Sequence, residues 1–232
     1  MQPDKERVKA FYDQNYYSDI EGSGHPTKHH IRLAERLGIN ADERLLDVAC
    51  GTGEWLKAVC VNGTKVSGID LSERAVDFCR RDNPHGDFHC QSCEQLPFEN
   101  DFFDWVSCLG SLEHFPDKSA SMTEMVRVLR PGGSLVMSVP NSDFIGYKLG
   151  LYAGTNQAGV IETPMPISFW QALGEGAGMK LTRKWRDLHF VNLDWIRQNG
   201  MVKAVPRGLA ALTIAALPLS LQYQVYFHFV KS

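Results

Sequence analysis

The sequence predicts an α/β fold, with a doubly wound and mostly parallel sheet that carries helices on both faces. The first observation is a βαβ pattern over residues 45–71: an apolar run, a glycine-containing turn, a helical segment, and a second run that ends in Asp70. The second observation is that strand-like and helix-like segments continue to alternate as far as Val139. Such alternation is typical of parallel sheets, whose strands are joined by helices and buried on both faces.

Each element is placed by its own period or turn residues. Two N-terminal helices are separated by the EGSGHP loop and precede the first strand. The clearest helix has an apolar stripe and stops at a PGG turn. The expected elements are helices Lys5–Tyr17 and Lys28–Leu37; strands Leu45–Val48, Lys65–Asp70 and Phe103–Leu109; helix Lys118–Arg130 with its stripe Met122, Met125, Val126 and Leu129; a strand within Leu129–Asn141; helix Ser168–Ala177; strand Met179–Asp187; a helical stretch Leu193–Leu217; and a last strand Tyr223–Val230.

Composition favours a small cytoplasmic protein. The chain has 232 residues, 44% of them hydrophobic and 22% charged, which is enough for one α/β domain with a sizeable core. The formal net charge of −3 disfavours a nucleic-acid partner. The polar N-terminus lacks the apolar core of a signal peptide, so we expect the six cysteines to be reduced.

The glycine turn is shaped for a ligand. Gly51 and Gly53 have no Cβ to keep a ligand from the backbone, and Asp70 ends the next strand, where a carboxylate can accept ribose hydroxyls. A dinucleotide site requires a third glycine, but Leu56 stands in its place. The helix also opens with Glu54, which would repel a pyrophosphate but not a cationic nucleoside.

These residues resemble the class I S-adenosylmethionine-dependent methyltransferases. The first family motif, an acid followed by three alternate glycines, is matched by DVACGTG at residues 47–53, where Ala49 replaces the first glycine. The likeness extends over residues 44–141 through CEQLPFENDFFDWVSCLGSLEHF and LRPGGSLVMSVPN. It implies a Rossmann-like fold of seven strands with the last antiparallel, S-adenosyl-L-methionine as cofactor, S-adenosyl-L-homocysteine as product, and a small-molecule acceptor.

The resemblance also implies where the cofactor lies. Its adenine is expected between Leu71 and Cys93, its ribose on Asp70, and its methionine end near Leu109 and Gly110. The family usually has an acid for the adenine amino group where this chain has Ser92. The full set of expected cofactor-binding residues is Ala49, Gly51, Gly53, Asp70, Leu71, Cys93, Glu94, Leu109 and Gly110.

For catalysis the resemblance implies an in-line displacement at the sulfonium methyl group. His114 is the candidate base for a hydroxyl acceptor, although a packing or capping role is equally compatible with its position. A quinone-pathway branch of the family suggests a metal at Glu113, His114 and Asp117, but we expect Asp117 to cap the helix that starts at Lys118.

A zinc site at Cys90 and Cys93 is disfavoured, because no second ligand pair follows them and both fall at the exit of the third strand. We therefore expect no bound metal, and small core residues at most of the cysteines. Aromatic and polar side chains of the N-terminal segment are candidates to line the acceptor pocket: Tyr12, Tyr16, Tyr17, His25, His29 and His30.

We expect a single domain over residues 1–232, with a helical cap (1–40), a cofactor-binding core (41–141), and a substrate-side insertion with the C-terminal strands (142–232). Residues 208–217 carry no charge and are too short before Pro218 to span a membrane. They predict an exposed apolar patch near the cleft, and hence a lipophilic or aromatic acceptor with peripheral membrane contact. A regulatory cofactor-binding protein and a nicotinamide-dependent enzyme remain alternatives, and the oligomeric state stays open.

Overall fold

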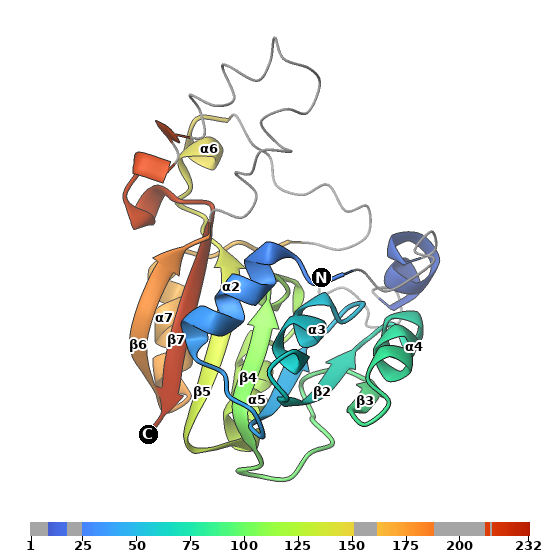
Figure 1. Ribbon diagram of the computed structural model, residues 1–232. Coiled ribbons are helices and arrows are strands. Elements are labelled where there is room, and N and C mark those ends of the chain that lie inside the picture. Colours follow the sequence, from blue (N-terminus) through green and yellow to red (C-terminus); the bar gives the residue numbers. More distant parts are fainter. Residues whose placement is uncertain (1–8, 18–24, 151–161, 188–211, 214) are drawn as a thin grey trace.

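The computed structural model describes residues 9–17, 25–150, 162–187, 212–213 and 215–232. Within them a seven-stranded sheet has the order β3-β2-β1-β4-β5-β7-β6 (Figure 1). Its strands are β1 Arg44–Val48, β2 Lys65–Asp70, β3 Asp87–Cys90, β4 Phe103–Leu109, β5 Leu129–Pro140, β6 Met179–Arg186 and β7 Gln224–Lys231.

The sheet has the predicted doubly wound topology. Strands β1 to β5 pair in parallel, and the strand order turns back between β1 and β4. The last strand, β7, is antiparallel to both of its neighbours, β5 and β6. The turning point between β1 and β4 matters for function, because ligands of open α/β sheets bind where the strand order reverses.

Helices cover both faces of the sheet (Figure 1). Because neighbouring strand residues point to opposite faces, Leu45 packs with α2, α3 and α4, whereas Leu46 packs with α5 and α7. The helical elements are η1 Tyr12–Tyr16, α2 Lys28–Leu37, α3 Glu54–Cys60, α4 Glu73–Asp82, η2 Leu112–His114, α5 Lys118–Val128, α6 Ile145–Lys148, α7 Ile167–Gly176 and η3 Leu219–Leu221.

Helix α5 ends two residues earlier than the sequence predicted. Leu129 already has extended backbone angles, with φ −71° and ψ 136°, and it pairs with Phe103 of β4. The pairing of β4 with β5 is then interrupted, and it resumes between Trp105 and Ser134. The PGG turn lies within this interruption. Strand pairing thus stops the helix before the turn is reached.

The two chain ends differ in how far the predictions can be followed. Helix α2 has the predicted bounds, and Thr27 caps it by accepting the N–H of His30 at 3.2 Å. Residues 9–16 are helical and include the π-helical turn η1, while the first part of the predicted helix Lys5–Tyr17 lies outside the described residues. The same holds for most of the predicted helical stretch Leu193–Leu217. Among the helices that the structure describes, none combines the length and apolarity needed to cross a membrane.

Candidate functional site

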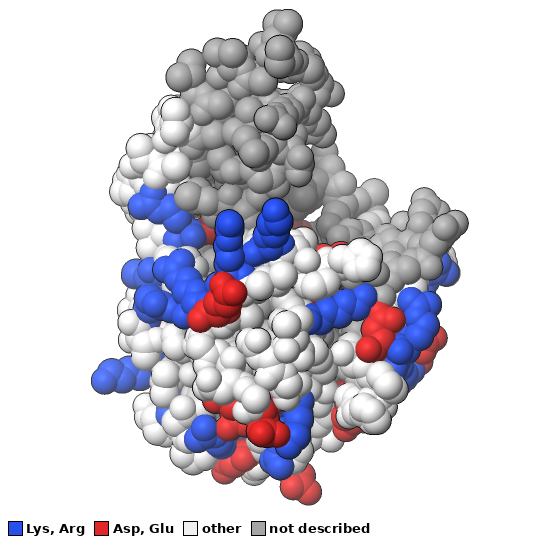
Figure 2. Space-filling view, viewed as in Figure 1, with Lys and Arg blue, Asp and Glu red and all other residues white. Residues whose placement is uncertain are grey.

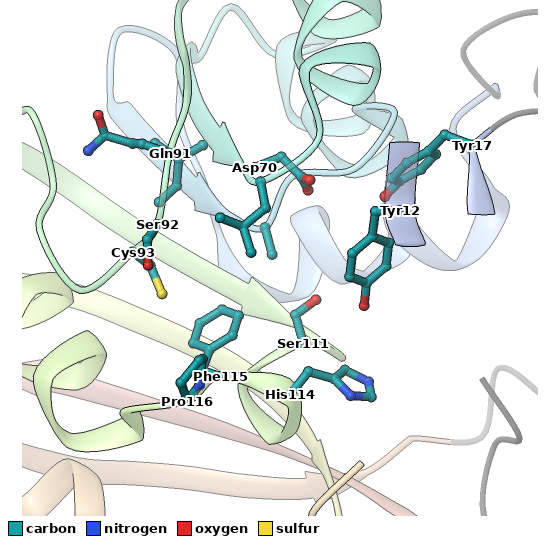
Figure 3. Close-up of a pocket in the computed structure, with 13 residues that line it drawn as sticks. Tyr12, Tyr17, Asp70, Gln91, Ser92, Cys93, Ser111, His114, Phe115 and Pro116 are labelled. Atoms are coloured by element: carbon teal, nitrogen blue, oxygen red, sulfur yellow. The ribbon is translucent and has the colours of Figure 1, made fainter. Parts of the chain in front are cut away.

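A pocket opens at the edge of the sheet where β1, β2, β3 and β4 end (Figure 3). Its walls come from the residues that directly follow these strands and from the N-terminal segment around η1. This is the switch point at which a doubly wound sheet offers a ligand site. The lining residues are Tyr12, Tyr17, Ala49, Ile69, Asp70, Leu71, Gln91, Ser92, Cys93, Ser111, His114, Phe115 and Pro116.

The turn after β1 is held in left-handed backbone conformations. Ala49, Gly51 and Gly53 have φ values of 62°, 52° and 79°. A Cβ on Gly51 would lie 3.1 Å from the Tyr17 hydroxyl oxygen, and one on Gly53 would lie 3.0 Å from the sulfur of Cys79. Gly51 and Gly53 therefore let the turn fit between the N-terminal segment and α4, while Ala49 forms part of the pocket wall.

Asp70 joins this turn to the pocket. Its Oδ2 accepts the N–H of Gly51 at 2.9 Å, and its Oδ1 accepts the N–H of Ser72 at 2.9 Å. Burial raises the pKa of the Asp70 carboxyl, while the hydrogen bonds from Ser72 and Gly51 act in the opposite direction. An ionised carboxylate has about four acceptor positions, so two bonds leave capacity for hydroxyl groups of a ligand.

A second buried acid, Asp47, lies beneath the same turn. The hydroxyl of Ser107 donates to Asp47 Oδ1 at 2.6 Å, and the indole N–H of Trp55 donates to that hydroxyl oxygen at 2.9 Å. Burial raises the pKa of Asp47 to about 7, with Ser107 opposing the rise and Asp70 adding to it. The sequence analysis gave Asp47 no role beyond the motif. The sequence did carry a signal for this buried acid, because Asp47 is the one charged residue inside the apolar run LLDVA.

The N-terminal segment closes one side of the pocket with Tyr12 and Tyr17 (Figure 3). It is attached to α4 through Asp13, whose Oδ1 accepts the hydroxyl of Ser72 at 2.5 Å. Lys9 adds a contact of 3.4 Å from its Nζ to the sulfur of Cys90. Two of the aromatic candidates from the sequence thus line the pocket.

The histidines of α2 are placed elsewhere. His29 Nε2 lies 2.9 Å from the hydroxyl oxygen of Tyr226, and the ring of His30 packs edge-on against Trp55. Neither is among the residues that line the pocket.

His114 reaches the pocket from η2, directly after a buried acid (Figure 3). Glu113 is 5% exposed, and within the described part of the chain its Oε2 has no hydrogen-bond partner. Burial raises the pKa of Glu113 to about 8, and the nearby Glu162 adds to the rise. The backbone oxygen of Glu113 accepts two hydrogen bonds from Thr163, at 3.3 Å from N and 2.6 Å from Oγ1.

Of the residues expected to bind the cofactor, Ala49, Asp70, Leu71 and Cys93 line the pocket. Glu94 lines a neighbouring depression together with Ser92, which donates to Glu94 Oε2 at 2.6 Å. The remaining four expected residues are not among those that line the pocket: Gly51, Gly53, Leu109 and Gly110.

The predicted capping role of Asp117 is confirmed, since its Oδ1 accepts the N–H of Ala120 at 2.9 Å. Cys90 and Cys93 have different partners, the oxygen of Leu71 and the hydroxyl of Ser121. In the ranges that the structure describes, no three His, Cys, Asp or Glu side chains are grouped so that they could hold a metal ion.

Comparison with known families bears directly on this site. Residues 46–137, which contain the glycine turn, Asp70 and His114, match a family model described as a methyltransferase domain. The segment that holds the candidate site thus matches a methyltransferase domain. The predicted resemblance and fold are both confirmed.

Two curated relatives resemble this methyltransferase domain. One is the ubiquinone biosynthesis O-methyltransferase of Aromatoleum aromaticum, 34% identical over 112 residues, which are 46% of this chain and 48% of that protein. The other is the demethylmenaquinone methyltransferase of Staphylococcus aureus, 36% identical over 117 residues, which are 45% of this chain and 46% of that protein. The chain thus spans about half the length of the curated relatives it matches.

Among solved structures, the [4+2]-cyclase SpnF superposes with a TM-score of 0.65 and 19% identity, over 100% of this chain and 97% of that chain. At this identity the likeness shows the fold alone. Its name as a cyclase illustrates that function must be argued from the site.

Proposed function

We propose that this methyltransferase domain transfers a methyl group from S-adenosyl-L-methionine to a small lipophilic or aromatic acceptor of the quinone type. The observation that carries the proposal is Asp70: a buried carboxylate at the strand-order switch point, tied to the glycine turn and facing a pocket. The names of the two curated relatives support a quinone-type acceptor.

In this proposal the ribose hydroxyls of the cofactor donate to Asp70. The adenine lies between Leu71 and Cys93, beside Ser92 and Glu94, and the methionine end points toward Leu109 and Gly110. The pocket and the turn beneath it carry two buried acids, Asp47 and Asp70. A ligand with a sulfonium and an ammonium group is attracted by both carboxylates and favours their ionised forms.

The reaction requires little acid–base chemistry. The methyl group of a sulfonium is already activated, so the protein aligns the acceptor atom with it in line and excludes water. If the acceptor is a hydroxyl group, His114 at the pocket wall is placed to take its proton. If the acceptor atom is a more acidic group or a carbon nucleophile, alignment with the methyl group is sufficient and no base is required.

The acceptor class is supported by the character of the pocket. Tyr12, Phe115 and Pro116 present aromatic and apolar surface opposite Asp70 (Figure 3). Pockets for small aromatic molecules have this mixture of apolar walls and a few polar groups. One relative is named as an O-methyltransferase and the other only as a methyltransferase, so the acceptor atom is left unassigned.

The test has two steps. Calorimetry should detect binding of S-adenosyl-L-methionine and not of a nicotinamide cofactor. Incubation with methyl-labelled cofactor and a panel of catechols and demethylated quinols should then produce labelled product. Binding without turnover on any acceptor would favour a regulatory cofactor-binding protein, and binding of the nicotinamide cofactor alone would overturn the assignment.

A further inference from the structure

Three consecutive side chains directly after β3 line one wall of the pocket: Gln91, Ser92 and Cys93. In the proposed function the adenine of the cofactor lies against this wall. Ser92 stands at the position where the family resemblance implies an acid for the adenine amino group. This chain therefore needs another group to recognise that part of the base.

Two of the three side chains make their hydrogen bonds within the protein. The amide of Gln91 donates to the backbone oxygen of Gln95 at 2.5 Å, and the side chain points away from the other labelled residues in Figure 3. The thiol of Cys93 donates to the hydroxyl oxygen of Ser121 at 3.1 Å, and a thiol sulfur is only a weak acceptor. Neither side chain is placed to bind a polar group of the base strongly.

The hydroxyl of Ser92 is held in one hydrogen-bonding role. It donates to Glu94 Oε2 at 2.6 Å, within the range of a hydrogen bond from a hydroxyl to a carboxylate. A hydroxyl has one proton to donate and two lone pairs with which to accept. Because the proton of Ser92 is directed at Glu94, its oxygen offers a ligand only lone pairs. Turning the proton toward the ligand would set these lone pairs against the carboxylate oxygen, which is repulsive.

The carboxylate of Glu94 is itself held in place. Its Oε1 accepts the backbone N–H of Asp117, the N-cap of α5, at 3.4 Å. Acidic and basic side chains are intermixed on the molecular face in Figure 2, and ion pairs such as that of Asp82 with Lys57, at 2.8 Å, neutralise acids at the surface. The two donors named for Glu94 are uncharged. Its negative charge therefore polarises the Ser92 hydroxyl and strengthens the oxygen as an acceptor.

We propose that Ser92, oriented by Glu94, selects adenine among purine bases by accepting a hydrogen bond from its exocyclic amino group. The assignment rests on the proposed function, because it requires the base to lie at this wall. Ser92 makes the contact, and Glu94 is a positioning residue that acts through it. A purine without the amino group leaves the Ser92 oxygen without a donor, and a purine with an oxygen in that place sets two acceptors against each other.

The experiment compares S-adenosyl-L-homocysteine with its 6-deamino analogue, which lacks only the amino group. Calorimetry measures both dissociation constants for the unaltered chain, for Ser92→Ala and for the control Ser119→Ala, an exposed serine of α5. We expect the unaltered chain and the control to bind the adenosyl ligand about tenfold or more tightly than the deamino ligand. In Ser92→Ala the two affinities should become nearly equal, while the affinity for the deamino ligand stays unchanged.

A second variant, Glu94→Gln, tests the positioning role. Its side-chain amide can donate to the Ser92 oxygen and so release the hydroxyl proton for the ligand. We therefore expect the affinity for S-inosyl-L-homocysteine, which carries an oxygen in place of the amino group, to rise about threefold or more over that of the unaltered chain. A loss of local structure would not raise the affinity for any ligand. An unchanged or lower affinity would overturn the role of Glu94.

The outcomes separate the role of Ser92 from the proposed function. If the unaltered chain binds neither the adenosyl nor the deamino ligand, the proposed function fails, and the assignment of Ser92 fails with it. If it binds both equally, or if Ser92→Ala keeps the full preference for the adenosyl ligand, only the role of Ser92 is overturned. Should circular dichroism show that Ser92→Ala is unfolded, Ser92→Cys, whose sulfur is a weak acceptor, replaces it.

Discussion

The carboxylate of Asp70 accepts the backbone N–H of Gly51 at 2.9 Å, which fastens the turn after β1 to the end of β2. The other carboxylate oxygen accepts the N–H of Ser72, the residue that caps α4. One side chain thus sets the shape of the glycine turn and the start of α4 while it faces the pocket. Its two roles, in folding and in ligand binding, are separable by substitution.

Asp70→Asn keeps one oxygen acceptor but loses the charge that a ribose hydroxyl would meet. We expect the affinity for S-adenosyl-L-methionine to fall about tenfold or more, because a hydrogen bond to a charged group contributes about 1.5–3 kcal/mol. Calorimetric titration measures the dissociation constant of S-adenosyl-L-methionine for each variant. Asp77→Asn, an exposed acid on α4, is the matched control. Equal affinities of Asp70→Asn and the control, in folded proteins, would contradict the assignment of the ribose site.

Gly53→Ala should destabilise the protein more than Gly63→Ala. Both glycines have left-handed angles, with φ 79° and 84°, so each substitution carries the left-handed penalty of about 1–2 kcal/mol. Only at Gly53 would the new methyl group crowd a neighbour, at 3.0 Å from the sulfur of Cys79; at Gly63 its nearest neighbour is Ala41 at 3.5 Å. We expect a further loss of about 1–3 kcal/mol in the free energy of unfolding in urea. Equal losses at the two positions would show that the crowding is relieved by movement of α4.

Local patterns were enough to place the core of this fold. Strand β2 has the predicted bounds, because its apolar run is closed by Lys65 and Asp70. The pairing of β5 with β4 could not be read locally, and so the end of α5 was misplaced at Arg130. Of the pocket residues that follow the strands, the sequence named Ala49, Leu71, Cys93 and His114, whereas Gln91, Ser111, Phe115 and Pro116 were not predicted.

Residues brought in from a distance could be named from the sequence only as candidates, without the contacts that place them. The pocket wall formed by Tyr12 and Tyr17 depends on the contact between Asp13 and Ser72, which joins segments far apart in the chain. The stacking of Arg36 on Trp185 is likewise a product of packing between α2 and β6. The placement of the cofactor itself and the domain division remain predictions.

Glu113 should make stability depend on pH. Its pKa is raised from 4.5 to about 8 in the folded protein, so between these pH values the folded chain holds a proton that the unfolded chain has released. The free energy of unfolding therefore falls as pH rises through this window. We expect Glu113→Gln to have a flatter profile than the unaltered protein, while the exposed Glu99→Gln keeps the original slope. Asp47, with a pKa of about 7, adds a slope of the same sign to all three proteins. Parallel profiles for Glu113→Gln and Glu99→Gln would show that Glu113 ionises normally.

His114→Ala tests the chemistry at the pocket wall. If the acceptor is a hydroxyl or amine, we expect turnover to fall by about 10²–10⁴, which is the usual contribution of a general base. The affinity for S-adenosyl-L-methionine should stay unchanged, because the proposed cofactor contacts do not include His114. Single-turnover rates with labelled cofactor separate the two effects, and His85→Ala, an exposed histidine before β3, serves as the control. Near-normal turnover in His114→Ala would leave alignment as the main source of rate, and the search for a proton acceptor would move to Glu113, the buried acid that precedes His114 in η2.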